Sequence, residues 1–333
     1  MNWFKYRLPQ TPDIICGASD SLIHGLGQGF VVAPFLNASE NIHTIPFDFI
    51  PDSKEIIAIN SSLPLSTPRV DYYSEIKAIK EELNGKRGKT VAARVINLDI
   101  SIDINATFDS LCQAYPEAFV FAFSTSETGT WIGASPELLL RKEEDFISTM
   151  ALAGTRPRTE KDEMWDKKNS EEQALVAEFI IGSLKRHCGT VTAGKTFTKK
   201  AGLIEHICTP ISASMPSSDI ADESDDSFNN TLRRLLIELS PTPAVCGSDR
   251  LLSLNIIRKY ENFPREMYGG FCGPNGIEDD IAFFVNLRSA KISKDAVAIY
   301  VGGGITPLSS SENEWMETEL KSKTIINQLK TSL

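Results

Sequence analysis

Short apolar runs separated by turn residues recur along most of the chain, whereas long amphipathic helical stripes are few. Runs typical of β-strands lie at residues 13–19, 29–35, 55–60, 89–100, 118–125, 128–155, 267–273, 281–293 and 296–304. Several of these runs follow one another after short turns, which favours antiparallel pairing. Because strands and helices do not alternate regularly, the pattern predicts an α+β fold with large mixed or antiparallel sheets.

Helical patterns are confined to the C-terminal stretch and to residues 74–85, 170–187 and 229–240. The strongest is the stripe over 170–187, which we expect Asn169 or Ser170 to cap. The acidic, Ser-rich residues 214–228 predict a surface loop. No repeat and no long Gly/Ser- or Pro-rich linker divides the 333 residues, so we expect one domain spanning residues 1–333.

The net charge, the lack of long apolar stretches and the spacing of cysteines and histidines limit the kinds of ligand and partner that we expect this protein to bind. The formal net charge of −10 argues against non-specific nucleic-acid binding and supplies no polybasic membrane patch. No stretch approaches twenty apolar residues, and residues 1–13 lack the apolar core of a signal peptide, so we expect a cytoplasmic protein that does not bind membranes. The cysteines form no C-x-x-C pair and the four histidines no H-x-x-x-H pair, so a zinc site is not expected.

In the segment 302–321, GGGITPLSSSENEWMETELK, three glycines lead through a Ser-rich turn into a helical pattern. A glycine loop before a helix is typical of phosphate binding, but this helix begins with acidic residues. Glu314, Glu317 and Lys321 are spaced three and four residues apart and share one helical face. Grouped carboxylates suit a hard cation such as Mg²⁺. Complementation of the helix dipole explains the same residues.

Asn169 and Glu172 form a second polar pair with the same three-residue spacing, beside the apolar stripe of residues 170–187. Two helices that each offer such a pair can hold one Mg²⁺ between them. Helix capping explains Asn169 and Glu172 nearly as well, so both interpretations stay open.

Three ionisable residues stand in apolar surroundings. Lys89 opens an apolar strand, where a lysine is usually a solvated edge residue. Glu137, in GASPELLL, would have a raised pKa and suit a general acid if it were buried, but a turn glutamate facing water is the simpler interpretation. Arg288 lies inside an apolar strand and needs an anionic partner if it is buried. The loop 239–247, LSPTPAVCG, is expected to shape a pocket wall.

Taken in order, these segments resemble the chorismate-utilising enzymes, the family of anthranilate synthase component I, and within it the isochorismate synthases. The resemblance covers roughly residues 75–330. It rests on five ordered motifs: KTVAAR, GASPELLL…LAGT, KKNSEEQALV, LSPTPAVCG, and YGGFCG…VNLRSAK…GGGITPLSSSENEWMETELK. It implies a single α+β domain of two large, mainly antiparallel sheets packed together with helices outside.

The resemblance also implies a role for each matching residue. Lys89 would be the general base that activates water, and Glu137 the general acid. Glu172 and Glu317 would bind Mg²⁺ directly and Glu314 through water. Asn169 would complete the metal site at a position where the family often has aspartate, so one negative charge is missing here.

The substrate implied by the resemblance is chorismate, which the enzyme would bind through the carboxylates of the substrate. The groups expected to contact it are the cations Arg288 and Lys321, the backbone N–H groups of Gly303 and Gly304, and residues Ala153, Gly154 and Thr155. Ser240 stands where relatives commonly carry a histidine, and no role follows for it.

The expected activity is the reversible, Mg²⁺-dependent isomerisation of chorismate to isochorismate by a monomer, for menaquinone or siderophore biosynthesis. Two alternatives stay open: a salicylate synthase, which would go on to eliminate pyruvate, and a non-catalytic chorismate-binding protein. Lys89 argues against anthranilate synthase, since family members that use ammonia lack this lysine.

Overall fold

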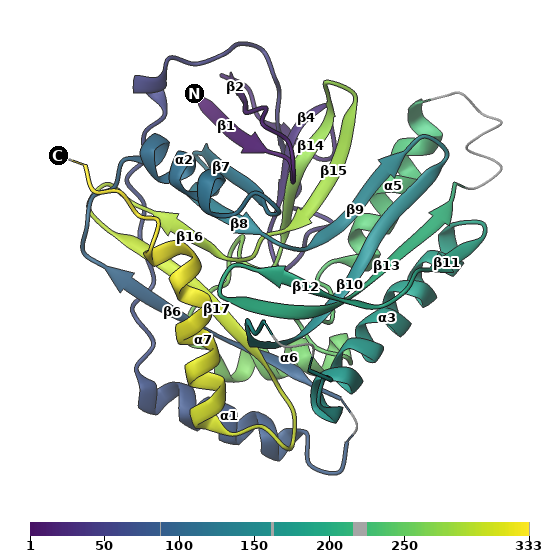
Figure 1. Ribbon diagram of the computed structural model, residues 1–333. Helices are drawn as coiled ribbons and strands as arrows, with labels where there is room; N and C mark the ends of the chain where they lie inside the picture. The colour runs from purple at the N-terminus through teal and green to yellow at the C-terminus, as the bar shows by residue number, and fades with distance from the viewer. Residues whose placement is uncertain (87, 161–162, 216–224, 333) are drawn as a thin grey trace.

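Two antiparallel sheets make up most of the computed structural model, which describes residues 1–86, 88–160, 163–215 and 225–332 (Figure 1). The seven-stranded sheet has the order β2 (Ile15–Ser19), β1 (Asn2–Arg7), β7 (Phe119–Thr125), β8 (Gly129–Ser135), β16 (Ser289–Ile292), β17 (Val297–Ile305), β6 (Thr90–Leu98).

The second sheet has ten strands. Its order is β11 (Val191–Ala193), β13 (Ile204–Ser214), β10 (Phe146–Pro157), β9 (Leu138–Glu143), β15 (Asp280–Val285), β14 (Phe271–Ile277), β4 (Gly29–Ala33), β5 (His43–Ile45), β3 (Ile23–His24), and β12 (Phe197–Ala201) pairs with β13 off this path.

Helices cover the outer faces of the sheets. They are η1 (Ser53–Glu55), α1 (Arg69–Glu82), α2 (Ile104–Ala114), α3 (Lys167–His187), α5 (Asp225–Leu239), α6 (Arg250–Tyr260) and α7 (Ser311–Ile326). Figure 1 shows α1 and α7 on one side of the molecule and α3 and α5 on the other. None of the helices in the described residues combines the length and the apolar composition needed to cross a bilayer.

The apolar pattern of each element explains where it packs. Val176, Ile180 and Leu184 recur along one face of α3 and are buried against the ten-stranded sheet. Between the two sheets lies an aromatic layer, in which Phe119 of β7 stacks on Phe284 of β15 with ring centroids 4.2 Å apart. Burial of this layer from water is what holds the two sheets together.

The α+β prediction with two large antiparallel sheets is confirmed. The extent of the expected domain stays a prediction, although strands from residues 1–45 pair within both sheets. Of the expected loop 214–228, residues 216–224 lie outside the described residues, Ser214 ends β13 and α5 begins at Asp225.

Several local predictions were wrong. Residues 55–60 form no strand, because Asp52 caps the short helix η1 and the chain then runs irregularly. The sequence patterns did not reveal β1, β3, β5, β11–β13, α2 or α6. Asp166, and neither Asn169 nor Ser170, caps α3: its carboxylate accepts a hydrogen bond from Asn169 N–H.

For the glycine run the sequence indicated both a strand over residues 296–304 and a loop before the C-terminal helix, and Gly302–Gly304 lie within strand β17. They pair in register with Val91–Ala93 of β6. β16, the neighbour of β17 on the other side, ends its pairing at Tyr300. The glycines therefore have a strand on one side only.

Candidate active site

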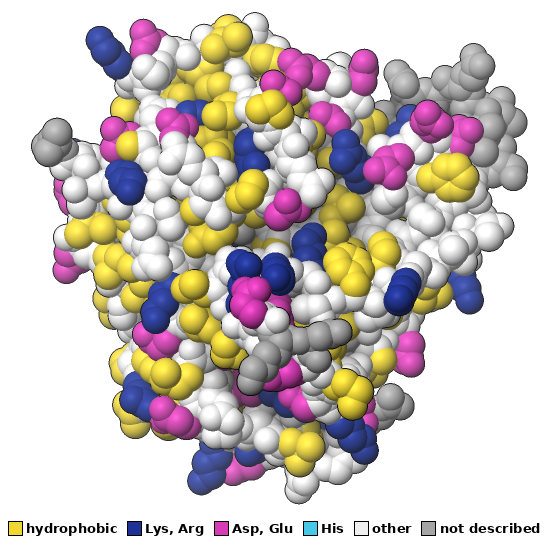
Figure 2. Space-filling model, viewed as in Figure 1, with side chains coloured by type: hydrophobic (Ala, Val, Ile, Leu, Met, Phe, Trp, Pro, Cys, Tyr) yellow, Lys and Arg dark blue, Asp and Glu magenta, His cyan; other side chains and the backbone are white. Residues whose placement is uncertain are grey.

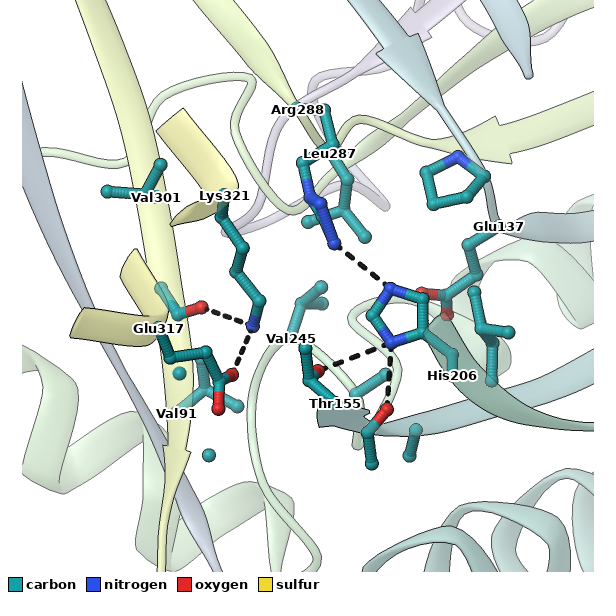
Figure 3. Close-up of a pocket in the computed structure, with 18 of the residues that line it drawn as sticks. Val91, Glu137, Thr155, His206, Val245, Leu287, Arg288, Val301, Glu317 and Lys321 are labelled. Carbon is teal, nitrogen blue, oxygen red and sulfur yellow. Dashed lines mark hydrogen bonds and ion pairs between the residues drawn. The ribbon is translucent and has the colours of Figure 1, made fainter. Parts of the chain in front are cut away.

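A cavity lies where β17, β10 and β13 approach α3 and α7 (Figure 3). Its empty space, counted together with the solvent at its mouth, is about 640 Å³. The sequence-predicted residues that line it are Glu137, Ala153, Gly154, Thr155, Glu172, Arg288, Gly303, Gly304, Glu317 and Lys321.

Three carboxylates from two helices converge on Gly303 and Gly304. A Cβ atom added to Gly303 would lie 3.0 Å from Glu314 Oε2 and 3.7 Å from Glu317 Oε1. A Cβ added to Gly304 would lie 2.9 Å from Glu172 Oε1. Any side chain at these two positions would therefore displace the carboxylates, which explains why glycine occupies both.

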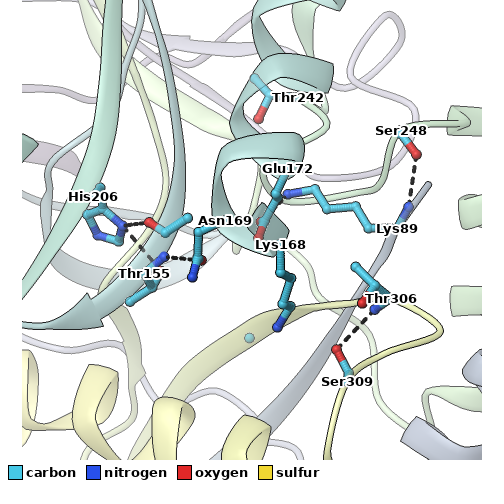
Figure 4. Close-up of polar contacts among 12 residues, drawn as sticks. Lys89, Thr155, Lys168, Asn169, Glu172, His206, Thr242, Ser248, Thr306 and Ser309 are labelled. Carbon is cyan, nitrogen blue, oxygen red and sulfur yellow. Dashed lines mark hydrogen bonds and ion pairs between the residues drawn. The ribbon is translucent and has the colours of Figure 1, made fainter. Parts of the chain in front are cut away.

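Each carboxylate pairs with its own lysine. Lys89 Nζ lies 2.5 Å from Glu172 Oε1, and Lys168 Nζ lies 2.9 Å from Glu314 Oε1. Lys321 Nζ lies 2.6 Å from Glu317 Oε1 and also donates to the Gly302 carbonyl. The three lysines come from separate elements: Lys89 directly precedes β6, Lys168 belongs to α3 and Lys321 belongs to α7 (Figures 3 and 4).

Sequence reasoning missed Lys168, although it directly precedes Asn169 in KKNSEEQALV. Burial lowers the pKa of Lys168, but the nearby charge of Glu314 outweighs this and raises it, so the ammonium stays charged. Burial alone would raise the pKa of Glu172, whereas the Lys89 ammonium holds it below its ordinary value.

Two buried oxygens at this cluster lack hydrogen-bond partners among the described residues: Glu314 Oε2 and the Tyr72 hydroxyl. Burial and the charge of Glu317 raise the pKa of Glu314. The Tyr72 hydroxyl would lie 3.9 Å from a Cβ atom added to Gly303. The sequence gave no reason to single out this tyrosine. Unpaired buried oxygen atoms beside grouped carboxylates fit a hard divalent cation.

The structure does not bring Asn169 together with the three carboxylates. Its Oδ1 accepts a hydrogen bond from Thr155 N–H at 3.0 Å, and its Nδ2 donates to Asp166 at 2.7 Å (Figure 4). Asn169 thus holds the backbone at Gly154 and Thr155 in place. Its predicted contact with a metal-bound water stays a prediction.

Glu137 is 2% exposed, so the interpretation as a solvated turn residue is wrong. Its Oε1 accepts a hydrogen bond from Thr242 Oγ1 at 3.2 Å. Burial raises the pKa of Glu137 to about 7, against a smaller opposing effect of Thr242 and Lys89. A carboxyl with this pKa can hold or release a proton near neutral pH.

Lys89 is likewise buried, so it is not a solvated edge residue. Its side chain lines a second cavity, which Glu172 also lines, and its ammonium contacts the Glu172 carboxylate, which faces the main cavity as well. Its backbone is anchored by Ser248, whose Oγ accepts from Lys89 N–H and whose N–H donates to the Lys89 carbonyl.

Arg288 and His206 form a buried pair that sequence reasoning did not foresee (Figure 3). Arg288 donates to His206 Nε2 at 3.1 Å, so Nε2 carries no proton and Nδ1–H donates to the Gly154 carbonyl at 2.8 Å. Burial and the charge of Arg288 hold the pKa of His206 well below its ordinary value. The neutral imidazole orients the guanidinium without neutralising it.

Arg288 has a φ of +49°, a left-handed conformation that non-glycine residues rarely adopt and that here places the guanidinium in the cavity. Within the described residues it makes no ion pair. A buried cation without a counter-charge favours an anionic ligand.

From the 239–247 loop, Ala244 and Val245 line the cavity, as predicted for a pocket wall. Ser240 is buried but is not among the described residues that line the cavity, and nothing in the structure explains its presence in place of histidine. On the face of the molecule shown in Figure 2, Lys and Arg side chains gather near the centre, with acidic side chains beside them.

Fold and site together place a buried glutamate, a buried arginine without an ion-pair partner among the described residues, and a cluster of carboxylates around one cavity. The sequence model of the family described as chorismate binding enzyme matches residues 54–330, and the chain belongs to this family.

Among curated relatives, isochorismate synthase EntC of Escherichia coli K12 is 30% identical over 254 residues, covering 72% of this chain and 61% of EntC. Isochorismate synthase MenF of the same organism is 31% identical over 255 residues, covering 73% and 56%. The matched region thus spans about three fifths of the length of these relatives.

Solved structures with the same fold include DhbC from Bacillus anthracis, with a TM-score of 0.80 and 22% identity over 98% of this chain and 96% of that one. MenF from Escherichia coli gives a TM-score of 0.79 and 21% identity over 98% and 88%.

Proposed function

We propose that the protein is an isochorismate synthase, an isomerase that converts chorismate to isochorismate with Mg²⁺. The observation that carries the proposal is the cavity in which the buried Glu137 and Arg288 lie with Glu172 and Glu317, together with the buried Lys89 directly behind Glu172. Relatives that carry this name at 30% identity support it.

The reaction adds a water oxygen to C2 of the ring and expels the C4 hydroxyl while the ring double bonds shift. Lys89, once neutral, accepts the proton that the attacking water loses. Glu137 donates its proton to the departing hydroxyl, which leaves as water. One water enters and one leaves, so the reaction is an isomerisation, and in reverse the two residues exchange roles.

The residues that would hold Mg²⁺ are Glu172 and Glu317 directly and Glu314 through water, with Asn169 nearby. The unpartnered Glu314 Oε2 supports this assignment. When bound, the cation supplies positive charge that stabilises the ring carboxylate as negative charge accumulates on it.

The chain's own cations would orient the substrate. Arg288, held by His206, would receive one carboxylate, with Lys321 and the backbone N–H groups of Gly303 and Gly304 close by. Ala153, Gly154 and Thr155, braced by Asn169 and His206, would form the opposite wall. The shielded cavity would strengthen each of these charge interactions.

We further propose that the enzyme works in the cytoplasm as a monomer and supplies isochorismate for menaquinone or siderophore biosynthesis. Cys208, Cys246 and Cys272 are buried and form no disulfide, which accords with a reducing compartment.

The test is incubation with chorismate and Mg²⁺, with and without EDTA, followed by chromatographic separation of the products. We expect isochorismate that depends on Mg²⁺ and is lost by a factor of roughly 10²–10⁴ in Lys89→Ala and in Glu137→Gln. Salicylate with pyruvate would identify a salicylate synthase instead. Mg²⁺-dependent chorismate binding without turnover would identify a non-catalytic binding protein.

A further inference from the structure

Two histidines and a glutamate meet at a place remote in sequence from every motif described above. His24 of β3 and His43 of β5 are directly opposed partners in the antiparallel pair of these strands. Glu127 lies in the turn between β7 and β8, which belong to the other sheet. One ligand atom from each of the three residues lies within 4.8 Å of the other two.

The distances suit a small coordination sphere. His43 Nε2 lies 3.3 Å from Glu127 Oε2, and His24 Nε2 lies 3.6 Å from Glu127 Oε1. Tetrahedral ligands about 2.05 Å from a zinc ion lie about 3.3 Å from one another. The side chains therefore need only small movements to bind a common ion.

The surroundings prepare these side chains for a ligand. The turn that carries Glu127 is fixed by Thr125, whose Oγ1 accepts hydrogen bonds from Glu127 N–H and Thr128 N–H. His43 is buried, and its Nε2 faces Glu127 Oε2. The negative charge of the Glu127 carboxylate, which faces both imidazoles, would also attract a bound cation.

We propose that His24, His43 and Glu127 bind a transition-metal cation of the zinc class. Two imidazole nitrogens and one carboxylate form a ligand set typical of Zn²⁺ and unlike the all-oxygen cluster around Gly303. His24 is largely exposed, so the fourth position is open to water. Local spacing in the sequence gave no sign of this cluster, because the pairing of β3 with β5 brings the two histidines together.

The bound ion would join the two sheets. β3 and β5 form the edge of the ten-stranded sheet, and β3 is the last strand there. Glu127 belongs to a hairpin of the seven-stranded sheet. An ion held by all three would stabilise the edge strands against fraying, and none of the three residues is among those that line the candidate active site.

The test is a calorimetric titration with Zn²⁺ alone as the probe, on the full chain with Mg²⁺ in excess to occupy the carboxylate cluster. We expect one additional Zn²⁺ per chain, and at a concentration 100-fold above Kd a rise in Tm of roughly 5 °C. In His24→Gln and in Glu127→Gln, whose side chains are 67% and 43% exposed and whose folding should be unaffected, affinity should fall at least about tenfold.

His187→Gln is the matched control, because His187 also pairs with a glutamate but belongs to no such cluster in the described residues. It should bind Zn²⁺ as the wild type does. Co²⁺ should show the d–d absorption of a four- or five-coordinate site in the wild type and lose it in His24→Gln. Equal Zn²⁺ binding by wild type and His24→Gln, or no binding at micromolar Zn²⁺, would overturn the proposal.

Discussion

Burial changes the chemistry of individual side chains at this site more than residue type does. Glu137 and Glu312 are both glutamates, yet the first is enclosed and has a raised pKa while the second is exposed beside Arg69 and has a lowered one. Enclosure makes the charged form of Glu137 costly, whereas hydrogen bonds from Tyr73 and then Arg69 favour the charged form of Glu312. The role proposed for Glu137 depends on this difference.

Formation of isochorismate should slow as pH rises through about 7, because Glu137 must carry a proton to act as the general acid. Well above this pH, the rate should fall roughly tenfold per unit. Thr242→Val should move this limb to higher pH, since the hydrogen bond from Thr242 lowers the pKa of Glu137. Rate profiles from pH 5.5 to 9 measure both, and a limb unmoved in Thr242→Val would contradict the assignment.

Lys168→Met should raise the affinity for Mg²⁺ severalfold, because the ammonium 2.9 Å from Glu314 competes with the cation for that carboxylate. Calorimetric titration of Mg²⁺ without substrate measures the effect. Lys167→Met is the matched control, as this neighbouring lysine is 90% exposed and pairs with Glu171. Unchanged or weaker Mg²⁺ binding in Lys168→Met would count against competition.

Helix α1 carries a buried glutamate, Glu75. Glu75 points inward from this helix, close to the buried pair of Glu261 and Arg265, and its Oε1 has no hydrogen-bond partner among the described residues. Burial first, and the charge of Glu261 second, raise the pKa of Glu75 to about 9. The packing of α1 against α6 therefore depends on a protonated carboxyl.

Glu75→Gln should stabilise the protein at pH 8 and have little effect at pH 4.5. The unfolded chain releases this proton near its ordinary pKa, whereas the folded chain keeps it up to about 9, so wild-type stability falls as pH rises between these values. Glutamine has no such proton to lose. Tm values from pH 4.5 to 9 test this, with Glu81→Gln on the exposed face of α1 as control; parallel Tm curves for wild type and Glu75→Gln would refute it.

The whole molecule is held together by the layer between its sheets. Residues from the N-terminal strands, from β7 and from β15 meet in one aromatic cluster, so segments hundreds of residues apart share one core. Both sheets therefore depend on the same buried surface, and weakening it should weaken the entire fold.

Phe284→Ala should lower the free energy of unfolding by about 3–5 kcal/mol, because it leaves a cavity against Phe119. The Tm should fall by roughly 4–7 °C. Phe146→Ala, which removes a 52% exposed ring from β10, should change stability by no more than about 0.5 kcal/mol. Urea unfolding measures both, and similar losses in the two variants would show that the layer is not central.

Sequence patterns located most strands, the strongest helix and most segments that contribute to the candidate active site. They succeeded where the signal is local: a two-residue alternation, a 3.6-residue stripe, or an ordered motif. They missed β13, which supplies His206, and they misplaced the cap of α3, which is Asp166.

The sequence by itself determined the α+β class, the family and the positions of the residues proposed as acid, base and metal-binding carboxylates. Only the tertiary structure decided that Glu137 is buried, that Lys168 pairs with Glu314, and that His206 orients Arg288 across 82 residues of chain. It also brought His24 and His43 to Glu127. The physical reason is that a pKa, an ion pair or a ligand set depends on what surrounds a side chain in space, and spacing along the chain records only its near neighbours.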